Sequence, residues 1–244
     1  MNRTIIRISG PDARDFLQGL VTNDVAGLDN GIVYAAMLTP QGRYIADFFL
    51  VPEGGDSILL DTHPDLADDL QKRLNMYKLR ADVTIEPTAI EVRRGSGPAP
   101  DGAFADPRHP EMGWRLYGAE AGDDGTDWDA IRVAHCIPET GIELTPDTFI
   151  LEAGFARLGG VDFHKGCYVG QEVTARMHHK TELRKGLATV EVEGAAAPGD
   201  AITNTAGKPV GTLHTRSGDR AIAYLRFDRA EGEMRAGEAT LRRA

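Results

Sequence analysis

The sequence predicts an α+β protein that ends in a small β-barrel. Strand-like runs and amphipathic helical segments are mixed over residues 1–137, which is typical of an α+β fold. After Lys185 the pattern changes to short alternating runs separated by Gly and Pro turns, which is typical of a small barrel. A chain of 244 residues is long enough for one large domain or for two to three small ones.

The N-terminal part is expected to begin with a strand over residues 3–8, followed directly by a helix. Ser9 is a plausible N-cap for this helix, and Pro11 fits its first turn. Three strand-like runs follow, and turn sequences rich in Gly and Pro separate them. These runs cover residues 32–38, 44–51 and 57–61.

An amphipathic helix is expected over residues 63–77, and residues 81–92 return to strand character. Strands, a helix and a further strand predict an α+β module of ferredoxin-like type. The apolar side chains of the helix recur at helical spacing, at Leu66, Leu70, Leu74 and Tyr77.

The chain is then expected to form a surface loop over residues 95–102, a strand over residues 114–118 and a helix over residues 126–137. Pro138 ends this helix, because proline cannot continue the helical hydrogen-bond ladder. Cys136 lies near the helix end and is expected to pack as a small buried residue.

The formal net charge of −10 argues against a large nucleic-acid footprint, because phosphate neutralisation requires clustered Lys and Arg. The first residues contain no apolar run long enough for a signal peptide, and no later run approaches the length of a membrane span. Two cysteines without a paired spacing suit a reducing cytosol better than a disulfide framework. We therefore expect a soluble, cytoplasmic protein that binds no membrane and forms no stable complex with nucleic acid.

The segment of residues 175–185 is a local exception to the acidic composition. It is interpreted either as a solvated helix face and turn or as a small anion-binding edge. A third reading, an RNA-binding module, is disfavoured by the net charge. The basic side chains of the segment are Arg176, Lys180, Arg184 and Lys185, with His178 and His179 between them.

Cys167 stands between two glycines in the segment of residues 164–172. A lone cysteine is most simply a buried packing residue. However, Gly166 and Gly170 permit unusual backbone angles and the close approach of another group. A cation on Lys165 and a helix starting at Gly170 would both favour the thiolate, which is the nucleophilic and metal-binding form. The residues alone leave open whether Cys167 is a functional thiol or an inert one.

Neither cysteine belongs to a C-x-x-C pair, so a closed zinc or iron–sulfur site made by this chain alone is not expected. His164, His178 and His179 are further candidate ligands, but adjacent histidines on a helix point in different directions. We therefore expect no permanently bound metal. The sequence also contains no Walker, dinucleotide-binding or G-x-S-x-G pattern.

The cysteine segment resembles the K-G-C-Y-x-G-Q-E signature of the YgfZ-type folate-binding proteins. These are paralogues of the glycine cleavage T-protein, and they assist iron–sulfur cluster assembly or repair and tRNA modification. The matching residues here are Lys165, Gly166, Cys167, Tyr168, Gly170, Gln171 and Glu172. Other stretches similar to the family are residues 16–25, 35–50, 77–85, 150–155 and 221–227.

The resemblance implies a T-protein-like arrangement, in which two interleaved ferredoxin-like α+β subdomains surround a central folate-sized cavity and a β-barrel follows. It divides the chain into a folate-binding module over residues 1–182 and a barrel over residues 183–244. It implies that Cys167 is a functional thiol at the cavity or its rim, and that Glu152 faces the pterin of tetrahydrofolate or a one-carbon derivative. Arg176 is the nearest basic candidate in sequence for the anionic folate tail.

By the same resemblance the chain is an accessory protein that binds a reduced folate and uses Cys167 to support iron–sulfur assembly or client proteins, including enzymes of tRNA modification. The thiol would attack a folate-borne one-carbon unit, exchange with other thiols, or transiently ligate a cluster that a partner holds. The sequence does not choose among these three roles, nor does it decide whether the protein turns over a substrate.

A folate-dependent aminomethyltransferase or demethylase is the alternative function. It is the weaker one, because the T-protein branch carries its catalytic aspartate in an Asn-rich stretch ending in Lys-Asp, and this chain has LLDTHPDLADDL at residues 59–70. The aspartates of that stretch are interpreted as polar positions and a helix cap: Asp61, Asp65, Asp68 and Asp69.

Overall fold

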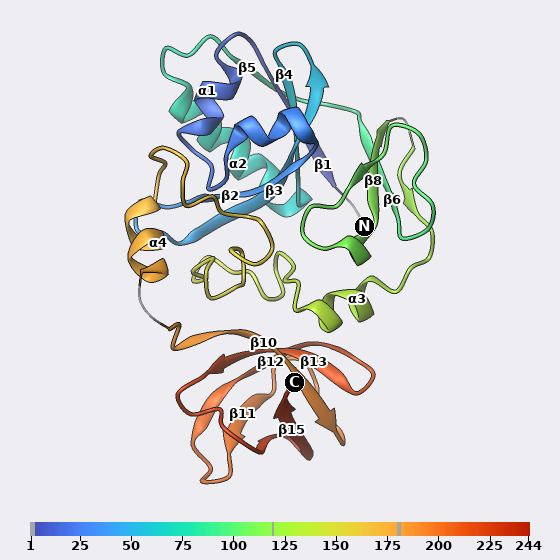
Figure 1. The fold of residues 1–244 in the computed structure, drawn as a ribbon, viewed down its shortest axis with the longest axis vertical. Coiled ribbons are helices and arrows are strands. Elements are labelled where there is room, and N and C mark those ends of the chain that lie inside the picture. Colours follow the sequence, from blue (N-terminus) through green and yellow to red (C-terminus); the bar gives the residue numbers. More distant parts are fainter. Residues whose placement is uncertain (1–2, 119, 180–181) are drawn as a thin grey trace. The chain divides into compact units, whose positions relative to one another are not determined.

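The computed structural model describes residues 3–118, 120–179 and 182–244, and Figure 1 shows their fold. The chain divides into two compact units. Unit 1 consists of Met1–Thr126 and Ala156–Val173, and unit 2 of Asp127–Phe155 and Thr174–Ala244. Among the described residues, no helix has both the length and the apolar character that a membrane crossing requires.

Unit 1 is built on a five-stranded sheet in the order β2-β3-β4-β1-β5, in which all neighbours are antiparallel. Tight turns connect β2, β3 and β4, so consecutive strands pair side by side. The predicted N-terminal strands are confirmed, although the third of them is longer than expected. The strands are β1 (Thr4–Ser9), β2 (Val33–Leu38), β3 (Tyr44–Gly54), β4 (Ser57–Thr62) and β5 (Thr84–Pro87).

Three helical segments pack their apolar side chains against one face of this sheet, which gives unit 1 its hydrophobic core. Leu70 and Leu74 of the predicted amphipathic helix are fully buried there, whereas Tyr77 is 37% exposed. The segments are α1 (Ala13–Gln18), η1 (Val25–Asn30) and α2 (Pro64–Lys78). Burial of this kind contributes about 25 cal/mol for each Å² of apolar surface removed from water.

The start of α1 differs from the expectation. Ser9 is not its N-cap, because it belongs to β1, where it pairs with Ser57 of β4. The cap position is taken by Asp12, whose side chain makes no capping hydrogen bond to the helix and instead accepts from the backbone N–H of Asp82. Ser9 has a residue type that favours an N-cap, but the pairing of β1 with β4 extends through this position and keeps it in the strand.

The expected strand over residues 81–92 is wrong as a single element. It divides at Thr88, whose backbone N–H and hydroxyl both donate to the carbonyl of Ile5. This contact ends the pairing of β5 with β1, and the chain continues into a separate four-stranded sheet in the order β7-β8-β6-β9. That sheet consists of β6 (Glu91–Gly95), β7 (Phe104–Ala105), β8 (Trp114–Gly118) and β9 (Gly122–Asp123), with the short helix η2 (Pro110–Met112) before β8.

Unit 2 begins with α3 (Trp128–His135), which matches the predicted helix. Cys136 caps its C-terminus with left-handed backbone angles, φ 50° and ψ 50°. Its side chain is half-buried, so the expectation of a buried packing residue is wrong.

The predicted C-terminal β-barrel is confirmed. Six strands close in the order β10-β13-β12-β11-β14-β15 around an apolar interior. Closure leaves no exposed sheet edge, which removes the usual route to strand-to-strand aggregation. The strands are β10 (Lys185–Glu193), β11 (Ala201–Asn204), β12 (Pro209–Ser217), β13 (Arg220–Arg226), β14 (Met234–Ala236) and β15 (Ala239–Arg243).

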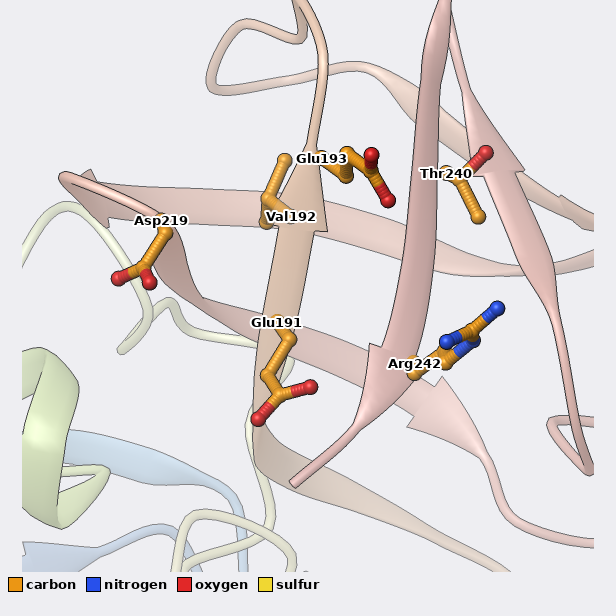
Figure 2. Close-up of a pocket in the computed structure, with 6 residues that line it drawn as sticks. All are labelled: Glu191, Val192, Glu193, Asp219, Thr240 and Arg242. Carbon is orange, nitrogen blue, oxygen red and sulfur yellow. The ribbon is translucent and has the colours of Figure 1, made fainter.

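The barrel carries a shallow acidic groove of about 350 Å³. Figure 2 shows that it combines three carboxylates with one guanidinium of the same chain, Arg242 on β15. The groove therefore already contains a cation of its own. Its lining residues are Glu191, Val192, Glu193, Asp219, Thr240 and Arg242.

Candidate functional site

Cys167 is exposed, in a turn segment that leads into α4 (Gln171–His178). The predicted helix near Gly170 is confirmed, with its first residue one position later. The reading of Cys167 as a buried packing residue is wrong, because its side chain faces solvent. Three residues hold the segment around this exposed cysteine: Asp162, Lys165 and Gly170.

The main anchor of the cysteine segment is Lys165, which is only 8% exposed. Its Nζ donates to three backbone carbonyls of unit 1, those of Gln18 at 2.8 Å, Val21 at 2.6 Å and Asn23 at 2.9 Å. Burial lowers the pKa of this ammonium to about 8. A lysine has three N–H donors, so none is left for the Cys167 sulfur. Lys165 therefore acts on the cysteine by holding the loop.

Asp162 provides a second anchor from the other side of the loop. Its Oδ1 accepts from the backbone N–H groups of His164 at 2.6 Å and Lys165 at 3.1 Å. The backbone N–H of Asp162 itself donates to the carbonyl of Thr22 at 3.0 Å. The segment that precedes Cys167 is thus tied to the N-terminal part of unit 1 at two points, Asp162 and Lys165, and Asp162 also holds the backbone of His164.

Gly170 closes the loop on its other side, and only glycine fits there. Its φ is +87°, and a Cβ at this position would lie 2.6 Å from the carbonyl oxygen of Thr39. Any side chain would therefore both strain the backbone and displace the turn between β2 and β3. This close approach explains the second glycine of the motif.

The remaining motif residues have different roles. Tyr168 is buried, with its ring 5.1 Å from the Lys165 Nζ, so it packs beneath the loop. Gln171 donates from Nε2 to the carbonyl of Gly166 over 3.4 Å, which is a weak contact. Glu172 is exposed and makes no hydrogen bond or ion pair with the residues that the structure describes. Cys167 and Glu172 are thus exposed chemical groups of this segment, together with the side chain of His164.

Lys165→Met is expected to loosen this segment without unfolding the protein. The variant leaves three carbonyls without their donor, which costs on the order of 1–3 kcal/mol of unfolding free energy. Hydrogen exchange should accelerate by about tenfold at the backbone amides of His164 and Lys165, because local opening becomes easier. Lys185→Met, at an exposed position of β10, is the control. Unchanged exchange in residues 164–168 would show that Lys165 is not the anchor.

The basic segment after the motif is only partly defined. Arg176 and His178 are exposed on α4, and the rings of His178 and His179 lie edge to face, 5.6 Å apart. Lys180, the next basic residue of the predicted segment, lies outside the described residues, as does Thr181. The two predicted roles of this segment, a solvated face and an anion-binding edge, both stay predictions.

Glu152 is half-buried and is fixed by the barrel strands of its own unit. Its Oε2 accepts from the Tyr224 hydroxyl at 2.6 Å, and its carbonyl accepts from the backbone N–H of Leu187 at 2.8 Å. Gly186 permits this approach, because a Cβ there would lie 2.8 Å from the Glu152 carbonyl oxygen. The contact of Glu152 with a pterin stays a prediction.

Unit 1 also contains an open pocket of about 690 Å³. It shares Asn23 and Asp162 with the anchors of the cysteine segment. Glu152 and Arg176, the residues predicted for folate, belong to unit 2 and do not line it. Its lining residues are Asn23, Asp24, Gly27, Asn30, Gly31, Ile32, Val33, Tyr34, Ala103, Phe104, Ala105, Pro107, Gly159 and Asp162.

A buried ion network that the sequence did not reveal lies on the other face of the five-stranded sheet. Asp61 is fully buried, and its carboxylate pairs with Arg3 and with Arg115, the latter at 3.2 Å. The Tyr117 hydroxyl donates to the same carboxylate at 2.8 Å. The interpretation of Asp61 as a plain polar position is therefore wrong, and the cap of α2 is His63, not an aspartate.

Arg115 also joins Asp61 to a second buried carboxylate. Its Nε donates to Asp106 at 3.1 Å, and Arg108 holds Asp106 through two further hydrogen bonds of 2.9 and 2.8 Å. Burial raises the pKa of Asp106, but the two guanidinium groups outweigh it and hold that pKa at about 2. The ring of Phe49 lies 3.9 Å from the Arg115 guanidinium. This network joins the two sheets of unit 1.

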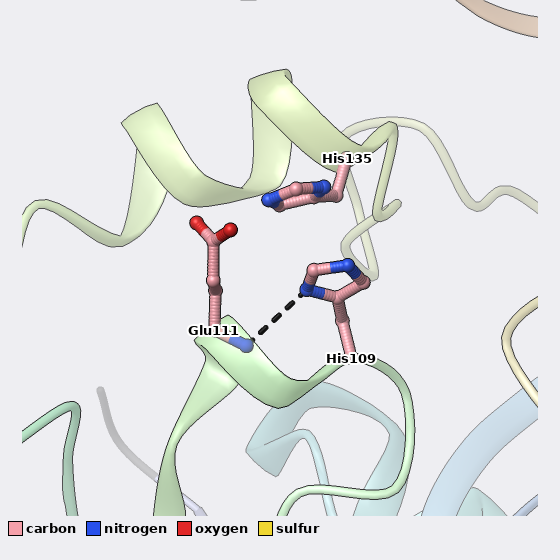
Figure 3. A group of neighbouring side chains, drawn as sticks. All are labelled: His109, Glu111 and His135. Atoms are coloured by element: carbon pink, nitrogen blue, oxygen red, sulfur yellow. Dashed lines mark hydrogen bonds between the residues drawn. The ribbon is translucent and has the colours of Figure 1, made fainter.

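Histidine side chains elsewhere in unit 1 serve local structure. Figure 3 shows the Nδ1 of His109 accepting from the backbone N–H of Glu111, at 3.2 Å, which caps η2. His135, also drawn in Figure 3, is the last residue of α3 in unit 2. His63 caps α2 in the same way as His109 caps η2, by accepting from the backbone N–H two positions later.

Comparison with known proteins supports the fold. Residues 184–244 match the family model described as CAF17, C-terminal beta-barrel domain. The structure superposes on the crystal structure of the glycine cleavage system aminomethyltransferase T from Bartonella henselae with a TM-score of 0.78, covering 98% of this chain and 81% of that one. At 13% identity this likeness shows the fold alone. The predicted T-protein-like α+β fold with a C-terminal barrel is confirmed.

Sequence comparison gives nearer relatives. The chain is 35% identical to the mouse protein named iron-sulfur cluster assembly factor IBA57, mitochondrial, and 32% identical to the human protein of the same name. Each match covers 95% of this chain and 78% of the relative. A homologue from Mycosarcoma maydis is 31% identical over 81% of this chain and 57% of its own length.

These names overturn one expectation. The mouse, human and Mycosarcoma relatives are all named as mitochondrial proteins, so the prediction of a cytoplasmic protein from composition is contradicted. Amino-acid composition and cysteine content reflect the redox conditions that a chain tolerates, and they do not determine its subcellular localisation. The identity and coverage of the mouse and human matches show that the chain belongs to the IBA57 family of iron–sulfur cluster assembly factors.

Proposed function

We propose that this protein supports the assembly or repair of iron–sulfur clusters and that Cys167 is its working thiol. The observation that carries the proposal is the contrast within one short segment. Cys167 is exposed, whereas Lys165 and Tyr168 on either side of it are buried and fixed. A fixed loop that presents a thiol to solvent is suited to a reaction of that thiol with a partner.

The thiol would act as a transient ligand to a cluster that a partner holds. Iron–sulfur clusters generally require four thiolate or imidazole ligands, and this chain has two cysteines in all. Cys167 alone therefore completes a coordination sphere that a partner supplies in part. The cluster is cargo here, and the partner is an iron–sulfur assembly or client protein.

A finer assignment to the YgfZ type rests on the K-G-C-Y-x-G-Q-E match at residues 165–172. With it we propose that the protein binds a reduced folate and that its clients include enzymes of tRNA modification. The second carboxylate oxygen of Glu152 is the proposed acceptor for pterin N–H groups, since the hydrogen bond from the Tyr224 hydroxyl is made to Oε2. Arg176, exposed on α4, is the proposed partner of the folate carboxylates.

Tetrahydrofolate is expected to raise the melting temperature, because a ligand that binds only the native state stabilises it by mass action. Glu152→Gln should weaken the shift, since an amide keeps the contact with Tyr224 but binds N–H donors less strongly than a carboxylate. Differential scanning calorimetry measures both. An unchanged melting temperature at millimolar tetrahydrofolate would remove folate from the proposal and leave the role of Cys167 intact.

Aminomethyl transfer is the second candidate, because the fold is that of an aminomethyltransferase. The aspartates of residues 59–70, where the catalytic aspartate was expected, give this activity little support. Asp61 forms ion pairs with Arg3 and Arg115 in the buried network. Asp65 and Asp69 are exposed on α2. A folate-dependent release of one-carbon units from an aminomethyl donor, retained in Cys167→Ala, would favour the enzyme over the assembly factor.

A further inference from the structure

The open pocket of unit 1 has an unusual balance of charge. Two of the residues that line it are acidic, Asp24 and Asp162, and none is lysine, arginine or histidine. The barrel groove differs, because it carries its own Arg242. At about 690 Å³ the unit 1 pocket has the size of a small-ligand or peptide site.

Each of the two carboxylates uses one oxygen for structure and keeps the other. The Oδ1 of Asp24 accepts from the backbone N–H of Ala26 at 3.0 Å and from Gln18 Nε2 at 3.1 Å. The Oδ1 of Asp162 accepts from the backbone of the cysteine segment, and this side chain is 30% exposed. No donor among the described residues reaches the Oδ2 atom of either aspartate.

Lys165 and His164 are the basic side chains near these two acids, and the His164 Nδ1 lies 3.7 Å from the Oδ1 of Asp162. Burial lowers the pKa of Lys165, and the charges of Asp24 and Asp162 raise it by less. All three N–H groups of Lys165 are donated to backbone carbonyls, so it forms no hydrogen bond to Asp24 or Asp162. The two acids and the ammonium together carry a net charge of −1, with both carboxylates still able to accept.

Part of the remaining pocket wall is apolar, and part is formed by the polar residues Asn23, Asn30 and Tyr34. Ile32, Val33, Phe104 and Pro107 line it beside the carboxylates. A long basic side chain needs this combination, because its methylene stem covers apolar surface while its charged head finds an acceptor. A volume of this size exceeds one side chain, so the residues flanking the basic one would enter as well.

We propose that this pocket receives an arginine or lysine side chain of a partner protein, next to the segment that presents Cys167. The inference rests on the proposed function, since the partner is the one that brings the cluster. The net charge of −10 favours a basic partner surface and accelerates its encounter with this chain. An anionic ligand is disfavoured, because no cationic side chain lines the pocket.

Occupancy of the pocket acts on the cysteine segment through shared residues. Asp162 lines the pocket and also accepts from the backbone of His164 and Lys165. Asn23 lines it too, and its carbonyl accepts from the Lys165 Nζ. A cation bound to the free oxygen of Asp162 would fix this carboxylate, and with it the backbone that precedes Cys167.

The test uses the full-length protein and a minimal basic probe, the capped tripeptide acetyl-Gly-Arg-Gly-amide, with its neutral citrulline counterpart. NMR titration should show saturable shifts at Asn23, Val33 and Asp162 with the arginine peptide, and binding at least about tenfold weaker with citrulline, as expected when a charge-assisted bond is lost. Hydrogen exchange at residues 163–168 should slow when the arginine peptide is bound.

Two variants and one control make the test decisive. Asp24→Asn combined with Asp162→Asn keeps both Oδ1 acceptors and removes the charge, so binding should weaken by about tenfold or more while the fold stays intact. Asn30→Lys, at an exposed position of the pocket, should weaken binding by placing a cation there. Asp219→Asn, in the barrel groove, should leave it unchanged.

Equal binding of the arginine and citrulline peptides, or equal binding by the double variant, would overturn the proposal. Shifts that appear at the same residues with tetrahydrofolate and not with the arginine peptide would overturn it as well, by showing an anionic ligand in the pocket. These outcomes are independent of the role of Cys167, because peptide binding requires no thiol. Failure of Cys167→Ala to lose function would remove the proposed function and leave a binding pocket without its assembly role.

Discussion

Cys167→Ala is expected to abolish the rescue of iron–sulfur enzyme activities in cells that lack this protein. The side chain is exposed and lies in a loop fixed by Lys165 and Gly170, so its removal takes away a thiol and no packing. The melting temperature of the purified variant should therefore stay within a degree or so of the wild type, as for surface substitutions that change stability by about 0.5 kcal/mol or less. The activities of cluster-dependent enzymes, measured in cell extracts, are the readout.

Cys136→Ala is the matched control, because it removes the other thiol of the chain. Cys136 is half-buried and has left-handed backbone angles at the end of α3. Its replacement should cost on the order of 1 kcal/mol of stability and leave rescue intact. Full rescue by Cys167→Ala, or equal loss in both variants, would contradict the assignment of Cys167 as the working thiol.

The strands and helices could be predicted from sequence where the signal is local. The runs that became β2, β3 and β4 are apolar and bounded by turns, and the leucines of α2 recur at helical spacing, so a short window contains the information. The division of residues 81–92 could not be predicted in this way. It depends on hydrogen bonds from Thr88 to Ile5, which is 83 positions away.

At the candidate site, too, features set by neighbouring residues could be predicted, and features set by residues far apart in the sequence could not. The position of Cys167 between two glycines marked it as a candidate, and the structure shows that its side chain is exposed. The role of Lys165 was not evident, because the carbonyls that it binds lie 142 to 147 positions earlier in the chain. Its proximity to the cysteine in sequence suggested direct assistance to the thiol, and the fold uses its ammonium as an anchor.

The buried ion network of unit 1 also could not be predicted from a short sequence window. Arg115 contacts Asp61 and Asp106, which lie 54 and 9 positions away, and both carboxylates are almost completely buried. A sequence window around Asp61 shows only an aspartate at the end of a strand. The signal that was available was weaker: an aspartate inside an otherwise apolar strand requires a buried partner.

Arg115→Met is expected to be the most destabilising single change among the residues of this network. It leaves Asp61 and Asp106 buried with one guanidinium fewer, and the loss of one partner of a buried ion pair costs about 3–5 kcal/mol. That is a large share of the roughly 5–15 kcal/mol that stabilises a typical domain. Urea denaturation followed by fluorescence measures the change. Arg73→Met is the control, because Arg73 pairs with Asp69 on the exposed face of α2 and should cost about 0.5 kcal/mol or less.

If Arg115→Met does not fold, the pH dependence of the wild type tests the same network. The pKa of Asp106 is about 2 in the folded protein against an ordinary value of 3.8. Because the folded-state pKa is the lower one, the stabilisation is fully present above pH 4 and is lost as the pH falls toward 2, by about 2 kcal/mol for this one group. Asp106→Asn should be less stable than the wild type at pH 7 and should lose less stability between pH 4 and pH 2. An equal loss in both proteins would show that Arg108 and Arg115 do not hold the Asp106 carboxylate ionised.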